Sequence, residues 1–204
     1  MADRRQHWES VYRDKAADQV GWFQPHAVSS LRLIQDKAGK DAHIIGGGGG
    51  ASVLVDDLLD AGYRNLTVLD LAGSALTASR ARLGVRAQAV QWIAADITRA
   101  DLPAARYDVW HDRAVFHFLT DPADRARYVA QVLASVKHGG YVIVAAFGLA
   151  GPLQCSGLEV VRYTPAALHA EFGAPFRLIR HETEIHHTPT GGEQEFVYCY
   201  CVRV

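Results

Sequence analysis

The first residues that could do chemistry are a run of five glycines at the end of an expected strand. Gly46 to Gly50 come directly after the apolar run 42–45, and a helical pattern opens at Ser52. Glycines at this place let the backbone approach a nucleotide closely, and the helix that follows offers free N–H groups. A nucleotide-like ligand is expected here, although a flexible turn without a ligand would use the same residues.

Two acids end the next two expected strands. Asp70 follows Gly48 by 22 residues, and a carboxylate there can accept hydrogen bonds from both ribose hydroxyls. Asp96 follows the third apolar run and could accept from an exocyclic adenine amine while Ile97 packs on the ring. Each acid could instead serve as a turn residue or a helix cap. Together with the glycines, they describe an adenosine site at three successive strand ends.

Aromatic and imidazole side chains form a second group of candidates. Trp8, Tyr12 and Trp22 lie near the N-terminus, where aromatic faces could attract a cationic ligand; ordinary packing of a helix on the sheet is the alternative. His117 follows the fourth apolar run, and a neutral imidazole is a suitable base near pH 7. A histidine that is hydrogen-bonded at a helix start is the alternative for His117.

The elements that must position these residues alternate along the chain. Expected strands and helices follow one another up to about residue 147, which predicts a parallel sheet built from βαβ units. The strands are expected at 42–45, 66–69, 89–93, 107–110 and 141–147, and the helices at 52–61, 74–83 and 123–136. A short helix from 164 to 172 is then expected, followed by strands at 176–187 and 195–204 around a turn at 188–192.

This order predicts an α/β fold with a mixed sheet, because the last two strands form an antiparallel hairpin at the edge of a parallel core. No repeat or linker divides the chain, so residues 1–204 are expected to form a single domain. Helices are expected in residues 1–40, before the first strand.

Composition excludes several classes of protein. With 49% hydrophobic and 21% charged residues the chain is globular, and a net charge of −1 favours neither nucleic acid nor an anionic membrane as partner. The longest apolar run, 141–147, is too short to span a membrane, and the polar residues 1–7 show no secretion signal. Three cysteines fit a reducing cytoplasm. Cys199 and Cys201 with Cys155 or His187 could bind a soft metal, but core packing is favoured and no metal is expected.

The glycine turn and the two acids resemble the class I S-adenosylmethionine-dependent methyltransferases. Residues 107–112 and 136–140 are similar to that family's fourth-strand motif and to the turn before its fifth strand. The resemblance implies a Rossmann-like sheet of order 3-2-1-4-5-7-6 with helices on both faces, and S-adenosylmethionine as cofactor. It implies cofactor-binding roles for these residues: Gly46, Gly48, Gly50, Asp70, Leu71, Asp96, Ile97 and His111.

Gly46 departs from the family, which usually has an acid there that orients the methionine moiety. Two further segments, His7 to Tyr12 with Gly21 to Phe23, resemble the lid of the small methyltransferase-like lysine methyltransferases, so residues 1–40 are expected to form a lid. In that group two acids flank a lysine after the fourth strand; here the segment runs from Asp112 to His117. Asp112 and His117 are therefore the catalytic candidates. The substrate candidates are Tyr12, Trp22, Arg113, Arg162 and His186.

The expected function is methyl transfer from S-adenosylmethionine to a small-molecule acceptor. Two alternatives stay open: methylation of a protein lysine, and a non-catalytic nucleotide-binding module, for which Gly46 is the motive. A nicotinamide-dependent oxidoreductase is disfavoured, because no Tyr-x-x-x-Lys pair is present and little chain follows residue 147. Methyl transfer from a sulfonium needs mainly in-line positioning, so a catalytic triad is not required.

Overall fold

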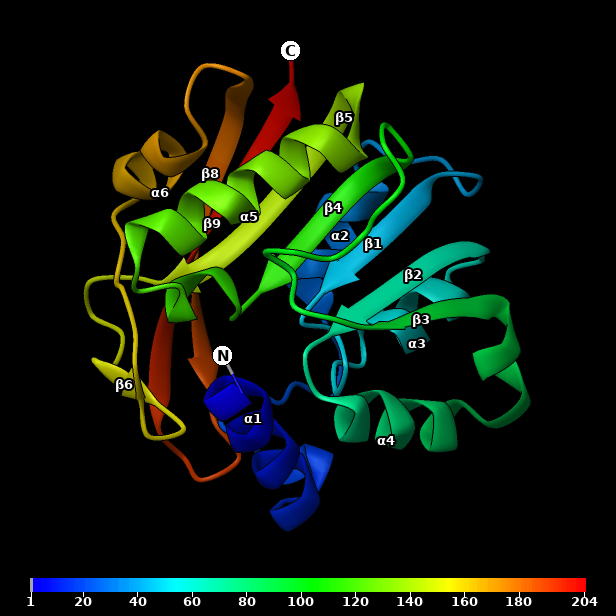
Figure 1. Cartoon of the computed structure of the whole chain (residues 1–204), viewed down its shortest axis with the longest axis vertical. Helices are drawn as coiled ribbons and strands as arrows, with labels where there is room; N and C mark the ends of the chain where they lie inside the picture. The colour runs from blue at the N-terminus through cyan, green and yellow to red at the C-terminus, as the bar shows by residue number, and fades with distance from the viewer. Residues whose placement is uncertain (1) are drawn as a thin grey trace.

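A seven-stranded sheet organises the chain, whose computed structural model describes residues 2–204 (Figure 1). The strand order is β3-β2-β1-β4-β5-β9-β8. Strands β1 to β5 run parallel to one another, and β9 is antiparallel to both β5 and β8. The strands are β1 (His43–Gly47), β2 (Asn65–Asp70), β3 (Val90–Ala94), β4 (Tyr107–Arg113), β5 (Val136–Phe147), β8 (Phe176–His187) and β9 (Glu193–Arg203). The predicted mixed sheet with its antiparallel C-terminal hairpin is confirmed.

Helices cover both faces of this sheet. Helices α5 (Pro122–Ser135) and α6 (Pro165–Phe172) lie on one face, and α2 (Val28–Gln35), α3 (Leu54–Asp60) and α4 (Gly73–Leu83) lie on the other (Figure 1). Both helices of the first face begin with a capping side chain followed by proline: Asp121 Oδ1 accepts from the Ala123 N–H, and Thr164 Oγ1 accepts from the Ala167 N–H. These caps satisfy N–H groups that a helix start leaves unpaired.

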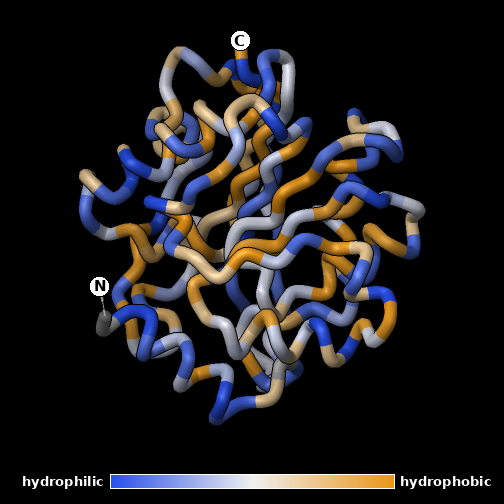
Figure 2. The backbone as a smooth tube through the Cα atoms, turned by 45° about the vertical axis from the view of Figure 1, so that its right-hand side comes forward, coloured by the Kyte–Doolittle hydropathy of each residue, from blue (hydrophilic) through white to orange (hydrophobic). Residues whose placement is uncertain are grey.

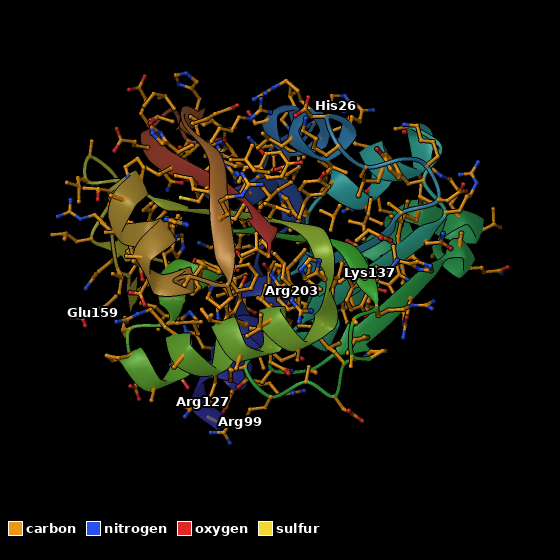
Figure 3. The ribbon with its side chains drawn as sticks, turned by 90° about the horizontal axis from the view of Figure 1, so that it is seen from above. His26, Arg99, Arg127, Lys137, Glu159 and Arg203 are labelled. Atoms are coloured by element: carbon orange, nitrogen blue, oxygen red, sulfur yellow. The ribbon has the colours of Figure 1, made fainter. Side chains whose placement is uncertain are left out.

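The core consists of two apolar clusters, one on each face of the sheet. Successive strand residues point to opposite faces, so Ile44 enters the cluster with α2 and α3, while Ile45 enters the cluster with α5 and α6. Hydrophobic segments run through the middle of the molecule (Figure 2), and charged side chains such as Arg99 and Glu159 lie on its outside (Figure 3). Burial on both faces explains why the central strands read as continuous apolar runs.

Strand β4 shows the same alternation at the positions that matter for chemistry. Trp110 packs in the cluster with α5, whereas Val109 packs in the opposite cluster with α2 and α3. Because the alternation has a period of two, Asp112 lies on the Trp110 side and His111 and Arg113 lie on the other. Neighbouring side chains of β4 therefore point to opposite faces of the sheet.

Three short features were not expected from the sequence. The turn at 136–140 is part of β5, where Gly139 has a φ of +77° beside a register shift against β4. A two-stranded hairpin, β6 (Gln154–Cys155) and β7 (Leu158–Glu159), follows β5. Three short 3₁₀ helices also occur: η1 (Ala17–Gln19), η2 (Gly84–Ala89) and η3 (Phe116–Phe118). Such short elements are set by local turns and carry no hydrophobic period.

Candidate active site

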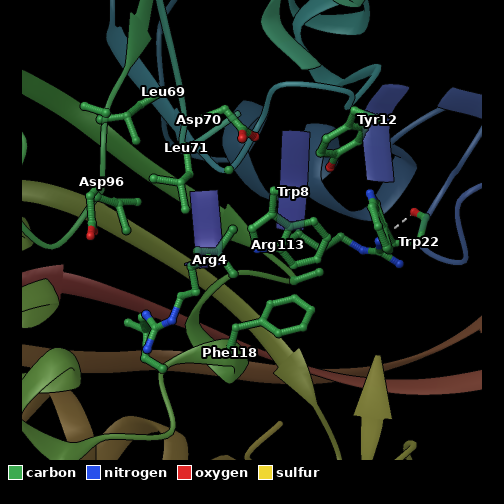
Figure 4. Close-up of a pocket in the computed structure, with 16 residues that line it drawn as sticks. Arg4, Trp8, Tyr12, Trp22, Leu69, Asp70, Leu71, Asp96, Arg113 and Phe118 are labelled. Carbon is green, nitrogen blue, oxygen red and sulfur yellow. Dashed lines mark hydrogen bonds between the residues drawn. The ribbon is translucent and has the colours of Figure 1, made fainter. Parts of the chain in front are cut away.

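A cavity lies at the carboxyl ends of β1, β2 and β4, beneath helix α1 (Ala2–Asp14). It runs from Asp96 past Asp70 to Arg113 and Trp22 (Figure 4). Its space, including the open mouth, is about 750 Å³. Open α/β sheets bind their ligands at this edge.

The glycine turn forms one wall of the cavity because its backbone has to pass close to other groups. Gly48 has a φ of +64°, and a Cβ atom there would clash with the Val115 side chain. A Cβ atom on Gly50 would lie 2.7 Å from Asp70 Oδ2. A side chain at Gly48 would thus push Val115 aside, and a side chain at Gly50 would displace the Asp70 carboxylate. Glycine is needed at these positions because the backbone lies against Val115 and Asp70, as well as for the positive φ of Gly48.

Asp70 is anchored by the backbone on both of its oxygens. Its Oδ2 accepts from the Gly50 N–H at 2.9 Å, and its Oδ1 accepts from the Ala72 N–H at 2.9 Å. Burial raises the pKa of Asp70 to about 6, while these backbone hydrogen bonds act in the opposite direction. Each oxygen keeps a further lone pair, so Asp70 can still accept from a vicinal diol.

Asp96 lies at one end of the cavity, and only one of its two carboxylate oxygens accepts hydrogen bonds from nearby residues that the structure describes. Its Oδ1 accepts from the Thr98 N–H at 2.9 Å and from the Thr98 hydroxyl at 2.8 Å, which makes it a turn residue as well. Its Oδ2 has no hydrogen-bond partner among the described residues. Leu71 and Ile97 line the same end and provide apolar surface for a flat ring. The geometry suits an adenine with its exocyclic amine toward Asp96.

Four aromatic side chains line the middle and the opposite end of the cavity. Trp8 is at the centre of the group, with ring centroids 6.2 Å from Tyr12, 5.7 Å from Trp22 and 5.0 Å from Phe118. The contacts of Trp8 with Trp22 and Phe118 are edge-to-face, a geometry that aromatic pairs prefer. Burial raises the pKa of Tyr12 well above its ordinary value, so its hydroxyl stays protonated at neutral pH.

Helix α1 is attached to both flanks of the cavity. On one flank, Glu9 accepts from the N–H groups of Gly73, at 2.7 Å, and Ser74, at 3.1 Å, at the start of α4. On the other flank, Arg4 Nη2 donates to Asp124 Oδ2 of α5 at 3.0 Å. The part of the expected lid formed by α1 therefore bridges the cavity, and its aromatic residues form the roof.

The two catalytic candidates from the sequence do not line the cavity. Asp112 is fully buried and accepts from the Tyr128 hydroxyl at 2.7 Å and from the Val115 N–H at 3.0 Å. His117 is fully buried, stacks on Phe147 with a centroid distance of 4.2 Å, and accepts from the Phe147 N–H at 3.3 Å. Burial raises the pKa of Asp112 to about 7 and lowers that of His117 to about 3.

The direction of the chain after β4 explains this correction. Ala114 has a φ of +71°, and the chain then turns into η3, so Phe118 reaches the cavity while His117 packs among Phe118, Phe147 and Phe196. A histidine without exposed surface cannot take a proton from an acceptor in the cavity. His117 and Asp112 instead hold the backbone in place beneath it.

Three of the five substrate candidates reach the cavity. Tyr12, Trp22 and Arg113 line it. Arg162 instead donates to the backbone carbonyl groups of Leu149 and Gly151. His186 is 4% exposed, and its Nε2 forms a hydrogen bond of 2.9 Å with the Gly21 carbonyl. These two residues organise loops around the site and do not face it.

The remaining cofactor candidates, Gly46 and His111, line an adjoining cavity that also reaches Gly48 and Arg113. His111 is 5% exposed, its Nε2 is 2.8 Å from Ser30 Oγ, and burial lowers its pKa to about 3. The two cavities therefore meet at the glycine turn.

Sequence reasoning missed Phe118, Arg4 and the capping role of Glu9. Phe118 stands at the end of a short aromatic stretch after β4, which is the one signal that could have pointed to it. The contacts of Arg4 and Glu9 cross more than 60 residues of chain, so no local pattern reveals them. Within the described residues no group of three or more histidine, cysteine or acidic side chains is placed to hold a metal ion.

Comparison with known proteins identifies the class. Residues 45–144 match a family model described as a methyltransferase domain. A search of curated proteins finds no match. Residues 45–144 therefore contain a methyltransferase domain of the class that uses S-adenosylmethionine as cofactor. The matched segment includes the glycine turn, Asp70, Asp96 and the end of β4.

Solved structures show the same fold at low sequence identity. A methyltransferase from Methanosarcina mazei aligns with a TM-score of 0.71 and 17% identity over 84% of this chain and 97% of its own. The 1,6-didemethyltoxoflavin-N1-methyltransferase of Burkholderia thailandensis, with S-adenosylhomocysteine bound, aligns with a TM-score of 0.71 and 20% identity over 100% and 88%. A phosphoethanolamine N-methyltransferase from Haemonchus contortus aligns with a TM-score of 0.67 and 12% identity over 87% and 52%.

The residues present fit the adenosine part of this cofactor. Asp70 has spare lone pairs for two ribose hydroxyls, Asp96 Oδ2 is a spare acceptor, and Gly48 borders the cavity with bare backbone, since a Cβ atom there would collide with Val115. The aromatic roof suits a sulfonium, since ring faces attract cations.

Proposed function

We propose that this methyltransferase acts on a small molecule whose nucleophilic atom carries no proton that a side-chain base must remove near neutral pH. The observation that supports the proposal is the make-up of the cavity beyond Asp70. Among the described residues that line this part, the ionisable groups are arginines and Tyr12; no imidazole or further carboxylate lines it. An acceptor that must lose a proton therefore receives no help from a side-chain base.

The same observation disfavours a protein lysine. A lysine ammonium enters a site most readily next to a carboxylate, and it must then lose a proton before it can attack. Here, beyond Asp70, no carboxylate of the described residues lines the cavity to receive it. A neutral or anionic aromatic acceptor, such as an aromatic thiol or a nitrogen heterocycle, suits these walls better.

The residues of this chain contribute to methyl transfer mainly by positioning the cofactor and the acceptor. The bound cofactor supplies a methyl group that its sulfonium already activates. Asp70 and Asp96 hold the adenosine, the glycine turn lets the backbone lie against it, and Val115 and Phe118 define the wall from which an acceptor approaches. Trp8 and Tyr12 exclude water from above. In-line positioning and exclusion of water can supply much of the rate of such a displacement.

We further propose that residues 1–204 work as a single unit in the cytoplasm, with α1 as the lid. The three cysteines are free and buried. None of the helices that the structure describes combines the length and the apolar character that a bilayer crossing requires.

The test is methyl transfer from radiolabelled S-adenosylmethionine to matched acceptors. Thiophenol and phenol have the same shape, but thiophenol ionises near neutral pH and phenol does not. We expect transfer to thiophenol and not to phenol, with a rate that rises with pH as the thiol ionises. A more acidic ring-substituted thiophenol should shift this rise to lower pH.

Two outcomes would overturn the proposal. Transfer to phenol at a comparable rate would show that a base does operate in the site. A lysine-containing peptide that is methylated while every small acceptor fails would establish the alternative acceptor class. Calorimetric binding of S-adenosylhomocysteine, measured first, shows that the protein is competent in each case.

A further inference from the structure

The end of the cofactor that carries its amino acid needs a partner, and the residue that usually supplies one is missing. Gly46 pairs in register with His111, so both lie on the same face of the sheet, two residues before Arg113. A Cβ atom on Gly46 would have only the Thr67 carbonyl oxygen near it, at 4.0 Å. Space for a side chain is therefore present, and the acid is absent for a reason other than crowding.

A third cavity continues from this point between the glycine turn and residues 20–30. It shares Trp22, Gly48 and Arg113 with the cavity that holds Asp70 and Asp96. A ligand whose adenosine lies on the two acids extends past Gly48 and enters this space. The polar side chains there are Gln24, Ser30, Ser52, His111 and Arg113. Of the charged residues that the structure describes, only the cation Arg113 lines it, and no carboxylate does.

Arg113 is held in a fixed position and keeps donors free. Its Nε donates to the Tyr198 hydroxyl at 3.0 Å, its Nη1 donates to the Trp22 carbonyl at 3.2 Å, and its Nη2 donates to Glu184 Oε1 at 3.0 Å. Its guanidinium also lies over the Phe196 ring, 4.1 Å from the centroid. A guanidinium has five N–H donors, so two remain after these contacts.

We propose that Arg113 binds the α-carboxylate of the cofactor's methionine end, and that this contact replaces the usual contact of an acid with the α-amino group. The inference rests on the placement of the adenosine proposed above. A fixed guanidinium forms strong, directed hydrogen bonds with a carboxylate. Glu184 is ion-paired with Arg113 at 3.0 Å and accepts from the Gln24 amide, but it does not itself line the third cavity.

The test uses ligands that differ only at this end. 5′-Methylthioadenosine has the adenosine and the sulfur but lacks the amino-acid end, and decarboxylated S-adenosylhomocysteine lacks the carboxylate alone. By calorimetry on the unaltered protein, we expect both to bind at least about tenfold more weakly than S-adenosylhomocysteine. Equal affinity of S-adenosylhomocysteine and its decarboxylated form would overturn the inference.

The variant Arg113→Met assigns the effect to this side chain. We expect it to lose roughly tenfold or more in affinity for S-adenosylhomocysteine while its affinity for 5′-methylthioadenosine stays within about twofold. The control is Glu184→Gln, which breaks the same ion pair but keeps the guanidinium, and in which the ratio of the two affinities should be preserved. A parallel loss for both ligands in Arg113→Met would reduce Arg113 to a structural role. If the unaltered protein binds none of the three ligands, the placement of the cofactor itself fails.

Discussion

At the scale of single residues, Asp70 carries the clearest electrostatic consequence. It is 6% exposed, and burial raises its pKa to about 6 although two backbone N–H groups donate to it. Ribose hydroxyls that donate to the carboxylate favour its ionised form. Binding of the cofactor should therefore release a proton at a pH below about 6.

The expected result is an affinity for S-adenosylhomocysteine that rises with pH. About a tenth of the Asp70 side chains are ionised at pH 5 and about nine tenths at pH 7, so the affinity should increase roughly tenfold over this range and then level off. Calorimetry at several pH values in buffers of different ionisation enthalpy measures both the affinity and the protons released. The affinity rises and does not fall with pH because the pKa of Asp70 is raised in the free protein and lowered when the ligand binds.

Asp70→Asn should bind more weakly at pH 7 and lose the pH dependence. Asp96→Asn is the matched control, because it changes the other cavity acid and leaves Asp70 in place; its affinity should still rise with pH. A flat profile for the unaltered protein would contradict the role assigned to Asp70.

At the scale of elements, the strands were predictable and the directions of side chains after β4 were not. Burial on both faces produces continuous apolar runs, which the sequence shows directly, and the helix caps at Asp121 and Thr164 can also be read from the sequence. The positive φ of Ala114 cannot be read in this way, yet it decides that Phe118 and not His117 reaches the cavity. That Asp70 and Asp96 line one cavity was predictable, because both stand at the ends of neighbouring parallel strands.

Helix α1 shows how one distant contact can control access to the site. Glu9 satisfies two N–H groups at the start of α4, and its hydrogen bonds with Ser74 are among the causes that lower its pKa. A carboxylate is favoured at a helix N-terminus, where backbone N–H groups lack partners. The same contact places Trp8 over the cavity, because Trp8 and Glu9 are neighbours on α1.

Glu9→Ala should therefore loosen the lid without changing any group that lines the cavity. We expect S-adenosylhomocysteine to dissociate roughly fivefold faster or more, since the loss of a charged hydrogen-bond acceptor costs about 1–3 kcal/mol. Stopped-flow measurement of tryptophan fluorescence on displacement of the ligand follows the rate through Trp8 and Trp22. Asp14→Ala removes an exposed acid of the same helix and is the control. Equal rates for Glu9→Ala and the unaltered protein would show that α1 does not limit release.

At the scale of the whole molecule, two buried acids and two buried histidines make opposing contributions to the dependence of stability on pH. The pKa values of Asp70 and Asp112 are raised to about 6 and 7, so their contribution to stability is lost as the pH rises through these values. Those of His111 and His117 are lowered to about 3, so their contribution is lost as the pH falls below the ordinary histidine pKa. The two effects oppose each other between about pH 4 and 7.

Because of this opposition, the contribution of one histidine has to be isolated by a variant. His117→Phe places an aromatic ring of similar shape in a cluster that already contains Phe118, Phe147 and Phe196. The unfolded chain binds a proton at His117 below about pH 6.5 and the folded chain does not, so the native histidine costs about 2 kcal/mol at pH 5 relative to pH 7. Urea unfolding at both pH values should show the variant gaining this amount over the unaltered protein at pH 5. The exposed His181→Phe should show no such gain, and an equal difference at both pH values would contradict a neutral, buried His117.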